Sequence, residues 1–208
     1  MADYVLEVKN LHTYFFADTG TVPAVDGVDF VLERGHTLGI VGESGSGKSV
    51  TSLSVIGLLM GTTGRVTEGE ILLDGEDITK YSEKQRRRLR GSKISMIFQE
   101  PMTSLNPVMK IGRQIREKIL QHEKISRADA DREVIRLLQM TGLPRVERIV
   151  NEYPFQLSGG QRQRVMIALA LACRPEILIA DEPTTALDVT IQAQILTLME
   201  QLKKETGT

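Results

Sequence analysis

Residues 42–49 read Gly-Glu-Ser-Gly-Ser-Gly-Lys-Ser and match the pattern G-x-x-x-x-G-K-[ST]. An apolar run at residues 37–41 precedes the pattern, and a helical pattern at residues 49–60 follows it. Glycines let backbone N–H groups turn inward, and the helix adds its positive end, so such a loop favours phosphate. A glycine-rich turn that merely begins a helix is the alternative. The flanking strand and helix patterns favour a phosphate-binding loop instead.

The side chains of this loop suggest that its ligand is a nucleotide with a metal ion. Lys48 is suited to reach the β and γ oxygens of ATP, and Ser49 is suited to ligate Mg²⁺. The other loop residues predicted to bind the nucleotide are Gly42, Ser44, Gly45, Ser46 and Gly47.

Two acids follow a second apolar run, at residues 177–180. The carboxyl end of a buried strand is where α/β proteins place their ligands. Asp181 therefore suits the Mg²⁺ shell, and Glu182 suits the orientation or deprotonation of an attacking water. Two solvated acids at the start of a loop are the alternative, which the phosphate loop earlier in the chain disfavours.

Hydrophobic patterns predict an α/β fold. Buried strands of a parallel sheet are expected at three compact apolar runs, residues 37–41, 94–98 and 177–180. Alternation predicts an additional small antiparallel layer near the N-terminus, at residues 5–8, 28–32 and 70–73.

Helical signals replace strand signals between residues 101 and 156, where Ser126 and Asp129 suggest a capping box. We expect residues 101–156 to form an inserted helical subdomain, and residues 1–100 and 157–208 to form the core. A final amphipathic helix, ending at Gly207, is predicted from apolar residues spaced by four, three and four: Ile191, Ile195, Leu198 and Leu202.

Composition excludes several classes of partner and setting. Lys plus Arg total 26 against 27 for Asp plus Glu, so no global positive field favours nucleic acid. The basic run at residues 84–90 is interpreted as a solvated helix face rather than a nucleic-acid patch. The single Cys173 cannot form an internal disulfide, which favours a reduced, cytosolic setting. The longest apolar run, residues 166–173, is far shorter than the roughly 20 residues of a membrane span.

The segment Leu157-Ser158-Gly159-Gly160-Gln161 opens a further helical pattern at residues 162–172. Ser158 suits an N-cap, and the paired glycines leave N–H groups uncovered, so a second anion site is predicted. Placed between the phosphate loop and the acidic strand, this segment resembles the signature of the ATPase subunits of ABC transporters, which have a P-loop NTPase core. The resemblance implies that it contacts, through Ser158, Gly159, Gly160 and Gln161, the γ-phosphate held by a second subunit.

The resemblance assigns roles to three further residues. It implies that Gln99 touches Mg²⁺ and relays the nucleotide state into the helical subdomain, with a polar residue that merely caps a buried strand as the alternative. It places Asp188 in a loop that acts across the dimer, although Asp188 would also make structural sense as a helix N-cap. Among Tyr14, Phe15 and Phe16 it favours Phe15 for stacking on adenine, with packing in the core as the alternative.

The resemblance covers essentially the whole chain and extends to one branch of the family. Residues 99–107 and 181–192 are similar to importers of dipeptides, oligopeptides and nickel, and residues 50–59 to the first of their two ATPase subunits. It implies hydrolysis of Mg-ATP at a dimer interface to drive import of peptides or a similar small solute. The implied partners are a sister ATPase or a second copy, two membrane permeases and an external solute-binding protein, at the cytoplasmic face of the membrane.

A soluble ABC ATPase of DNA repair or translation is the alternative, but its long coiled-coil insertions or second cassette are missing from this sequence. The sequence departs from the family pattern at one histidine, which family members carry after the acidic strand to contact the γ-phosphate. His12, His36 and His122 all precede that strand. We therefore expect a chain that lacks its last sheet strands and that is weak or inactive as an ATPase alone.

Overall fold

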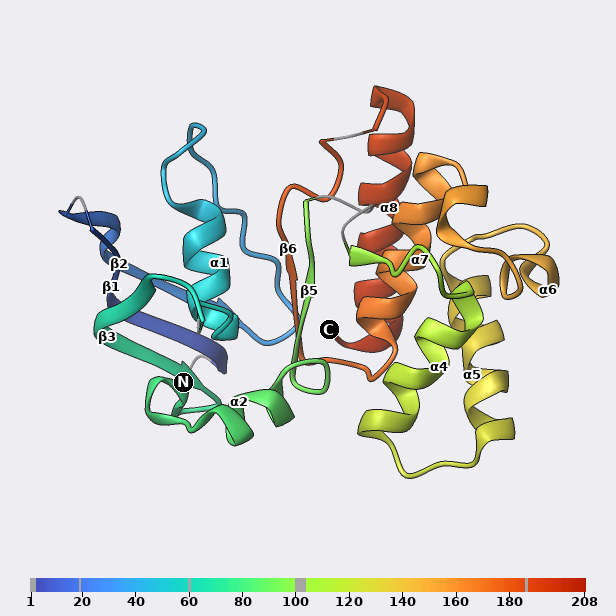
Figure 1. The fold of residues 1–208 in the computed structure, drawn as a ribbon, viewed down its shortest axis with the longest axis horizontal. Helices are drawn as coiled ribbons and strands as arrows, with labels where there is room; N and C mark the ends of the chain where they lie inside the picture. Colours follow the sequence, from blue (N-terminus) through green and yellow to red (C-terminus); the bar gives the residue numbers. More distant parts are fainter. Residues whose placement is uncertain (1–2, 19, 60, 100–103, 186) are drawn as a thin grey trace. The chain divides into compact units, whose positions relative to one another are not determined.

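The computed structural model describes residues 3–18, 20–59, 61–99, 104–185 and 187–208. Figure 1 shows the elements, which divide into two compact units, Met1–Arg90 and Gly91–Thr208. Outside the described residues lie residue 60 and the start of the predicted helical subdomain, together with parts of the two stretches that are similar to importers, residues 99–107 and 181–192.

The first unit contains the predicted antiparallel layer. Its four strands pair in the order β2-β1-β3-β4, and their bounds are β1 (Tyr4–Ala17), β2 (Gly20–Glu33), β3 (Gly64–Leu73) and β4 (Glu76–Asp77). Alternation in β1 buries Leu6 and Val8. The strands extend well beyond the short stretches predicted, because shifts of register absorb the breaks in alternation, as between Val8 and Leu11.

Helix α1 (Lys48–Ile56) follows the glycine-rich loop and packs on this sheet. A buried hydrogen bond joins the hydroxyl groups of Thr13 on β1 and Ser54 on α1, whose oxygens lie 2.8 Å apart. The predicted end of the helix at residue 60 is wrong. Gly57 adopts a left-handed conformation with φ 69°, and its N–H binds carbonyls of the last turn, which terminates the helix.

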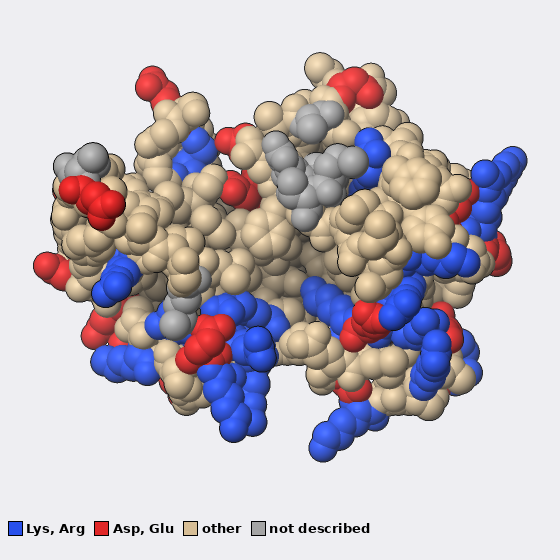
Figure 2. All heavy atoms as spheres, viewed as in Figure 1, with Lys and Arg blue, Asp and Glu red and all other residues tan. Residues whose placement is uncertain are grey.

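The basic run forms α2 (Glu83–Leu89), preceded by the 3₁₀ turn η1 (Ile78–Lys80). Figure 2 shows basic side chains gathered where Figure 1 places α2. The interpretation as a solvated face is wrong for two arginines. Arg86 donates to the carbonyl oxygens of Thr79 and Tyr81 at 2.6 and 3.1 Å.

The second of these arginines, Arg90, caps α1. Its guanidinium donates to the carbonyl oxygens of Ile56 and Gly57 at 3.1 and 2.5 Å, where the helix has unpaired carbonyls. Glu83 holds the guanidinium through both carboxylate oxygens, at 2.7 and 3.2 Å. This hydrogen bond to Arg90 lowers the pKa of Glu83.

We expect Arg90→Gln to destabilise the protein by about 1–2 kcal/mol, because it removes a cation from the C-terminal carbonyls of α1. Urea denaturation followed by circular dichroism measures the change. Arg87→Gln is the matched control, since Arg87 lies in the last turn of α2, which Arg90 follows directly, and has no hydrogen bond to any described residue. Equal changes in the two variants would contradict the capping role of Arg90.

Residues 37–41 form no strand, contrary to prediction. The exposed fractions are 43% for Leu38, 48% for Ile40 and 96% for Val41. A strand needs a hydrogen-bonded neighbour, and among the described residues the parallel sheet consists of β5 and β6 alone. Apolar composition by itself therefore did not decide whether this run forms a strand.

The second unit contains the other two predicted parallel strands, β5 (Ile94–Ile97) and β6 (Ile177–Ala180). They pair without interruption from Ile94 opposite Ile177 to Ile97 opposite Ala180. Ile94, Ile97 and Ile177 are buried. The predicted Phe98 falls beyond the end of β5, and its ring is partly exposed.

The helices of the second unit lie together on one side of this strand pair (Figure 1). Their bounds are α4 (Ile111–His122), α5 (Arg127–Met140), α6 (Val146–Ile149), the 3₁₀ turn η2 (Pro154–Gln156), α7 (Gly159–Leu171) and α8 (Val189–Thr206). Ser126 caps α5 by accepting the N–H of Asp129 at 3.1 Å. The buried centre of the unit includes Ile115, Ile119, Leu138, Ile167 and Ile195.

Helix α8 confirms the predicted amphipathic pattern. Ile195, Leu198 and Leu202 are buried, and Gly207 ends the helix with φ 72°. At 18 residues α8 is the longest described helix. The described helices include none whose length and apolar composition would carry it across a membrane.

Lys118 on α4 joins three elements of the second unit. Its amino group donates to the hydroxyl of Ser95 on β5 at 3.1 Å and to the carbonyl of Leu169 on α7 at 2.8 Å. Burial lowers the pKa of Lys118, because loss of water disfavours the charged form. The contact fixes α4 to the strand pair and to the last turn of α7.

Candidate functional site

The glycine-rich loop depends on Gly47 for its shape. Gly47 is the N-cap of α1 and has φ 90°, a conformation that favours glycine. A Cβ at this position would lie 2.3 Å from the carbonyl oxygen of Ala24 on β2. The backbone of the loop can approach β2 so closely only because residue 47 has no side chain.

The loop has the features of an anion site. Lys48 folds back over it and donates to the carbonyl oxygens of Gly42 and Glu43, both at 2.8 Å. Gly47 offers α1 no side-chain cap, and the first turn of the helix has no acidic residue. The N–H groups at the positive end of the helix, beside an exposed loop and a lysine, therefore fit phosphate.

The acidic edge follows from the parallel register of β5 and β6. Ile97 lies opposite Ala180, and the N–H of Asp181 continues the ladder by donating to the Ile97 carbonyl at 3.0 Å. Gln99 and Glu182 both follow two residues after this pair, so they emerge side by side. The Gln99 amide Nε2 donates to Oε2 of Glu182 at 2.8 Å.

Sequence reasoning missed one residue of this edge. Thr185 donates its hydroxyl to Oε2 of Glu182 at 3.1 Å, and the same hydroxyl lies 3.3 Å from the Glu182 carbonyl oxygen. Threonine hydroxyls often bind backbone a few residues away, so the spacing of three was an available signal. The carboxylate contact could not be foreseen, because it depends on the turn that follows β6.

The signature segment forms a capping box at the start of α7. The Ser158 hydroxyl accepts the N–H of Gln161 at 3.3 Å, and the Gln161 side chain accepts the N–H of Ser158 at 2.9 Å. This contact of the Gln161 side chain was not predicted, and its role toward nucleotide stays a prediction. Gly160 lies close to α8, since a Cβ there would be 3.2 Å from Ile191.

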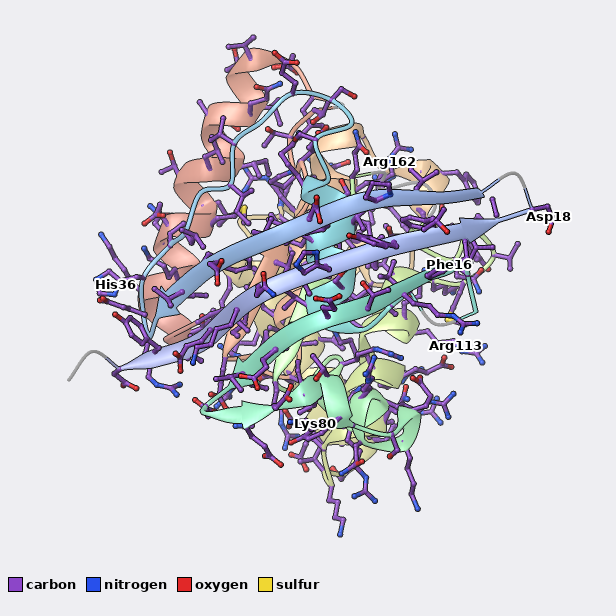
Figure 3. The ribbon with its side chains drawn as sticks, turned by 90° about the vertical axis from the view of Figure 1, so that its left-hand side faces the viewer. Phe16, Asp18, His36, Lys80, Arg113 and Arg162 are labelled. Carbon is purple, nitrogen blue, oxygen red and sulfur yellow. The ribbon has the colours of Figure 1, made fainter. Side chains whose placement is uncertain are left out.

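Asp188 and Phe15 have clear structural contacts. Asp188 caps α8, as its sequence position indicated, by accepting the N–H of Ile191 at 3.0 Å. The ring of Phe15 covers Gly64, where a Cβ would lie 2.8 Å from it. Figure 3 shows Phe16 and Asp18 near the end of the β1–β2 hairpin. The dimer role of Asp188 and the adenine role of Phe15 remain predictions.

The glycine-rich loop that opens α1 identifies this chain as a member of the P-loop class. Residues 25–185 match the model of the ABC transporter family. The fold is similar to the dimeric structure of MJ0796, a bacterial ABC transporter cassette, with a TM-score of 0.83, 32% identity and coverage of 97% of this chain and 84% of that one. This chain belongs to the ABC transporter family.

Curated relatives are more similar to this chain in sequence than this structural neighbour is. Over 98% of the chain, identity is 55% to the oligopeptide transport ATP-binding protein AppD and 54% to OppD, both of Bacillus subtilis. Over 97% of the chain, identity is 53% to the dipeptide transport ATP-binding protein DppD of the same organism. The chain spans 62%, 57% and 60% of the lengths of these three proteins.

Proposed function

We propose that this chain is the ATP-binding subunit of an importer of peptides or a similar small solute, and that it hydrolyses Mg-ATP at an interface between two ATPase subunits. The observation that carries the hydrolytic part is the hydrogen-bonded pair of Gln99 and Glu182 at the carboxyl end of the parallel strands. The names of the relatives, which are oligopeptide and dipeptide transport ATP-binding proteins, support the class of solute. They do not favour the alternative of a soluble ABC ATPase.

The glycine-rich loop would bind the phosphates of ATP. Loop N–H groups and the start of α1 would contact the phosphate oxygens, and Lys48 would exchange its two carbonyl acceptors for the β and γ oxygens. The described residues contain no cluster of three His, Cys, Asp or Glu side chains that could hold a metal ion. The proposed ligands Ser49, Gln99 and Asp181 fit Mg²⁺ that arrives with the nucleotide, since phosphate oxygens and water complete its shell.

Glu182 would orient the attacking water and accept its proton. Gln99 holds Oε2 of the carboxylate, so the amide nitrogen is committed to Glu182 and the amide oxygen is directed elsewhere. That oxygen is the atom with which Gln99 would touch Mg²⁺. Bound Mg²⁺ would neutralise charge on the phosphate oxygens during hydrolysis.

The signature segment would complete the site of a second subunit. The exposed Ser158 stands at the positive end of α7, and the following glycines leave the backbone accessible to an anion. One structural neighbour is a dimer, and another is described as a post-hydrolysis state bound to ADP and Pi. The proposed partner is a sister ATPase or a second copy, together with two permeases and an external solute-binding protein at the cytoplasmic face of the membrane.

We also propose that residues 101–156 act as a helical subdomain on a core formed by residues 1–100 and 157–208. The helices α4 and α5 within that range pack against each other and against α7. They therefore adjoin the helix that the signature segment begins.

Turnover per chain is expected to rise with protein concentration, since each site needs two subunits. Ser158→Arg should lower turnover about tenfold or more with little change in ATP affinity, because the side chain fills an anion site built of backbone. Steady-state ATPase assays over a concentration series, with nucleotide affinity measured alongside, test both expectations.

Ser126→Arg is the matched control, because Ser126 also caps a helix in the same unit through its hydroxyl. Both variants lose a cap, at a cost of about 1 kcal/mol. Equal loss of turnover in the two variants would assign the effect to helix capping. Turnover that is independent of concentration would overturn the shared site.

A further inference from the structure

Glu182 has a backbone conformation that needs support. Its φ is 46°, in the left-handed region that residues with a Cβ avoid. This conformation costs on the order of 1–2 kcal/mol, so it persists where neighbouring groups hold it. The support in this structure comes from the turn that follows β6.

Thr185 contacts both the backbone and the carboxylate of Glu182. Its N–H donates to the Glu182 carbonyl oxygen at 3.3 Å, and its hydroxyl lies 3.3 Å from that oxygen. The hydroxyl is closer to Oε2, at 3.1 Å. A hydroxyl has one hydrogen, so the shorter contact is the better hydrogen bond and the backbone N–H serves the carbonyl.

The two oxygens of the Glu182 carboxylate are thereby made different. Oε2 accepts hydrogen bonds from both Gln99 and Thr185, at 2.8 and 3.1 Å. Oε1 has no hydrogen-bond partner among the described residues. A carboxylate held at one oxygen by two donors from different segments cannot rotate freely, and its second oxygen is left for a ligand.

We propose that Thr185 is a positioning residue for ATP hydrolysis, which fixes the Glu182 carboxylate so that Oε1 faces the attacking water. The inference rests on the proposed role of Glu182. Thr185 itself touches neither water nor nucleotide in this mechanism. Proton transfer requires the accepting oxygen within hydrogen-bond reach of the water, and a displacement of about 1 Å can reduce the rate about 100-fold.

The hydroxyl of Thr185 affects the position of the Glu182 carboxylate more than the stability of the fold. Thr185 is exposed, and a hydrogen bond that water can replace contributes little to folding. Loss of the hydroxyl should therefore reduce kcat while the fold and ATP binding remain. This separates a positioning role from a merely structural one.

The adjacent Thr184 provides a matched control. Its carbonyl accepts the N–H of Leu187 at 3.0 Å, and its hydroxyl makes no hydrogen bond to any described residue. Replacing either threonine by valine removes one hydroxyl and keeps the shape of the side chain. The two valine variants therefore compare the loss of a hydroxyl that contacts Glu182 with the loss of one that does not.

The experiment measures kcat and KM for Mg-ATP in the protein assembled with its partner subunits, for Thr185→Val, Thr185→Ser and Thr184→Val. We expect Thr185→Val to lower kcat about 10- to 100-fold with KM nearly unchanged. Thr185→Ser restores the hydroxyl and should keep kcat within about threefold of the parent, and Thr184→Val within about twofold.

Three results would overturn the inference: an unchanged kcat in Thr185→Val, an equal loss in Thr184→Val, or no recovery in Thr185→Ser. Glu182→Gln, assayed in parallel, tests the proposed function separately. If Glu182→Gln keeps its turnover, the proposed function of Glu182 fails. If Glu182→Gln is inactive while Thr185→Val is fully active, only the role of Thr185 fails.

Discussion

Glu182→Gln is expected to lower ATP turnover about 100- to 10,000-fold and to leave ATP affinity nearly unchanged. The amide has the size of the carboxylate and can accept the hydrogen bonds of Gln99 and Thr185 through its oxygen, but it cannot take a proton from water. Steady-state turnover and direct nucleotide binding, measured on the same preparation, separate the two effects.

Glu147→Gln is the control for this variant, because Glu147 lies exposed on the short helix α6. It should match the parent protein in both measurements. If Glu182→Gln lost binding and turnover to the same extent, Glu182 would be a binding residue and the proposed role in water activation would be wrong.

Lys48→Ala is expected to weaken ATP binding about 100-fold or more. Charge-assisted hydrogen bonds contribute about 1.5–3 kcal/mol each, and the lysine can offer several to the phosphates. In the free protein its amino group holds the carbonyls of Gly42 and Glu43. Isothermal titration with ATP measures the loss, and turnover falls with it.

Lys80→Ala is the matched control, because Lys80 is an exposed lysine of the same unit that pairs with Asp77. Loss of this lysine should leave nucleotide affinity unchanged. Similar affinities for Lys48→Ala and the parent protein would show that the glycine-rich loop does not bind the phosphates through this side chain.

Short-range signals in the sequence predicted the elements that carry the candidate site. The serine cap of α7 and the stop at Gly207 each depend on neighbours along the chain. The run at residues 37–41 has the same apolar character as β6 but forms no strand in the structure. Composition cannot distinguish these two cases, because pairing is a tertiary property.

Two of the contacts that were missed link residues far apart in sequence. The hydrogen bond between Gln99 and Glu182 needs the register of two strands, one of which ends at Ile97 and the other of which begins at Ile177. Arg90 reaches the carbonyl of Ile56, and this contact turned a presumed solvated arginine into a helix cap. A sequence pattern identifies side chains that can donate hydrogen bonds, but it does not identify the groups that accept them.

Lys118 connects α4 to the two elements of the second unit that lead to candidate site residues, the strand β5 and the helix α7. Its ammonium binds Ser95 on β5, the strand that leads to Gln99, and Leu169 in the last turn of α7, the helix that begins after Ser158. Pulling α4 away would strip a desolvated cation of its acceptors, at a cost on the order of a few kcal/mol. A displacement of α4 would therefore move β5 and α7 with it.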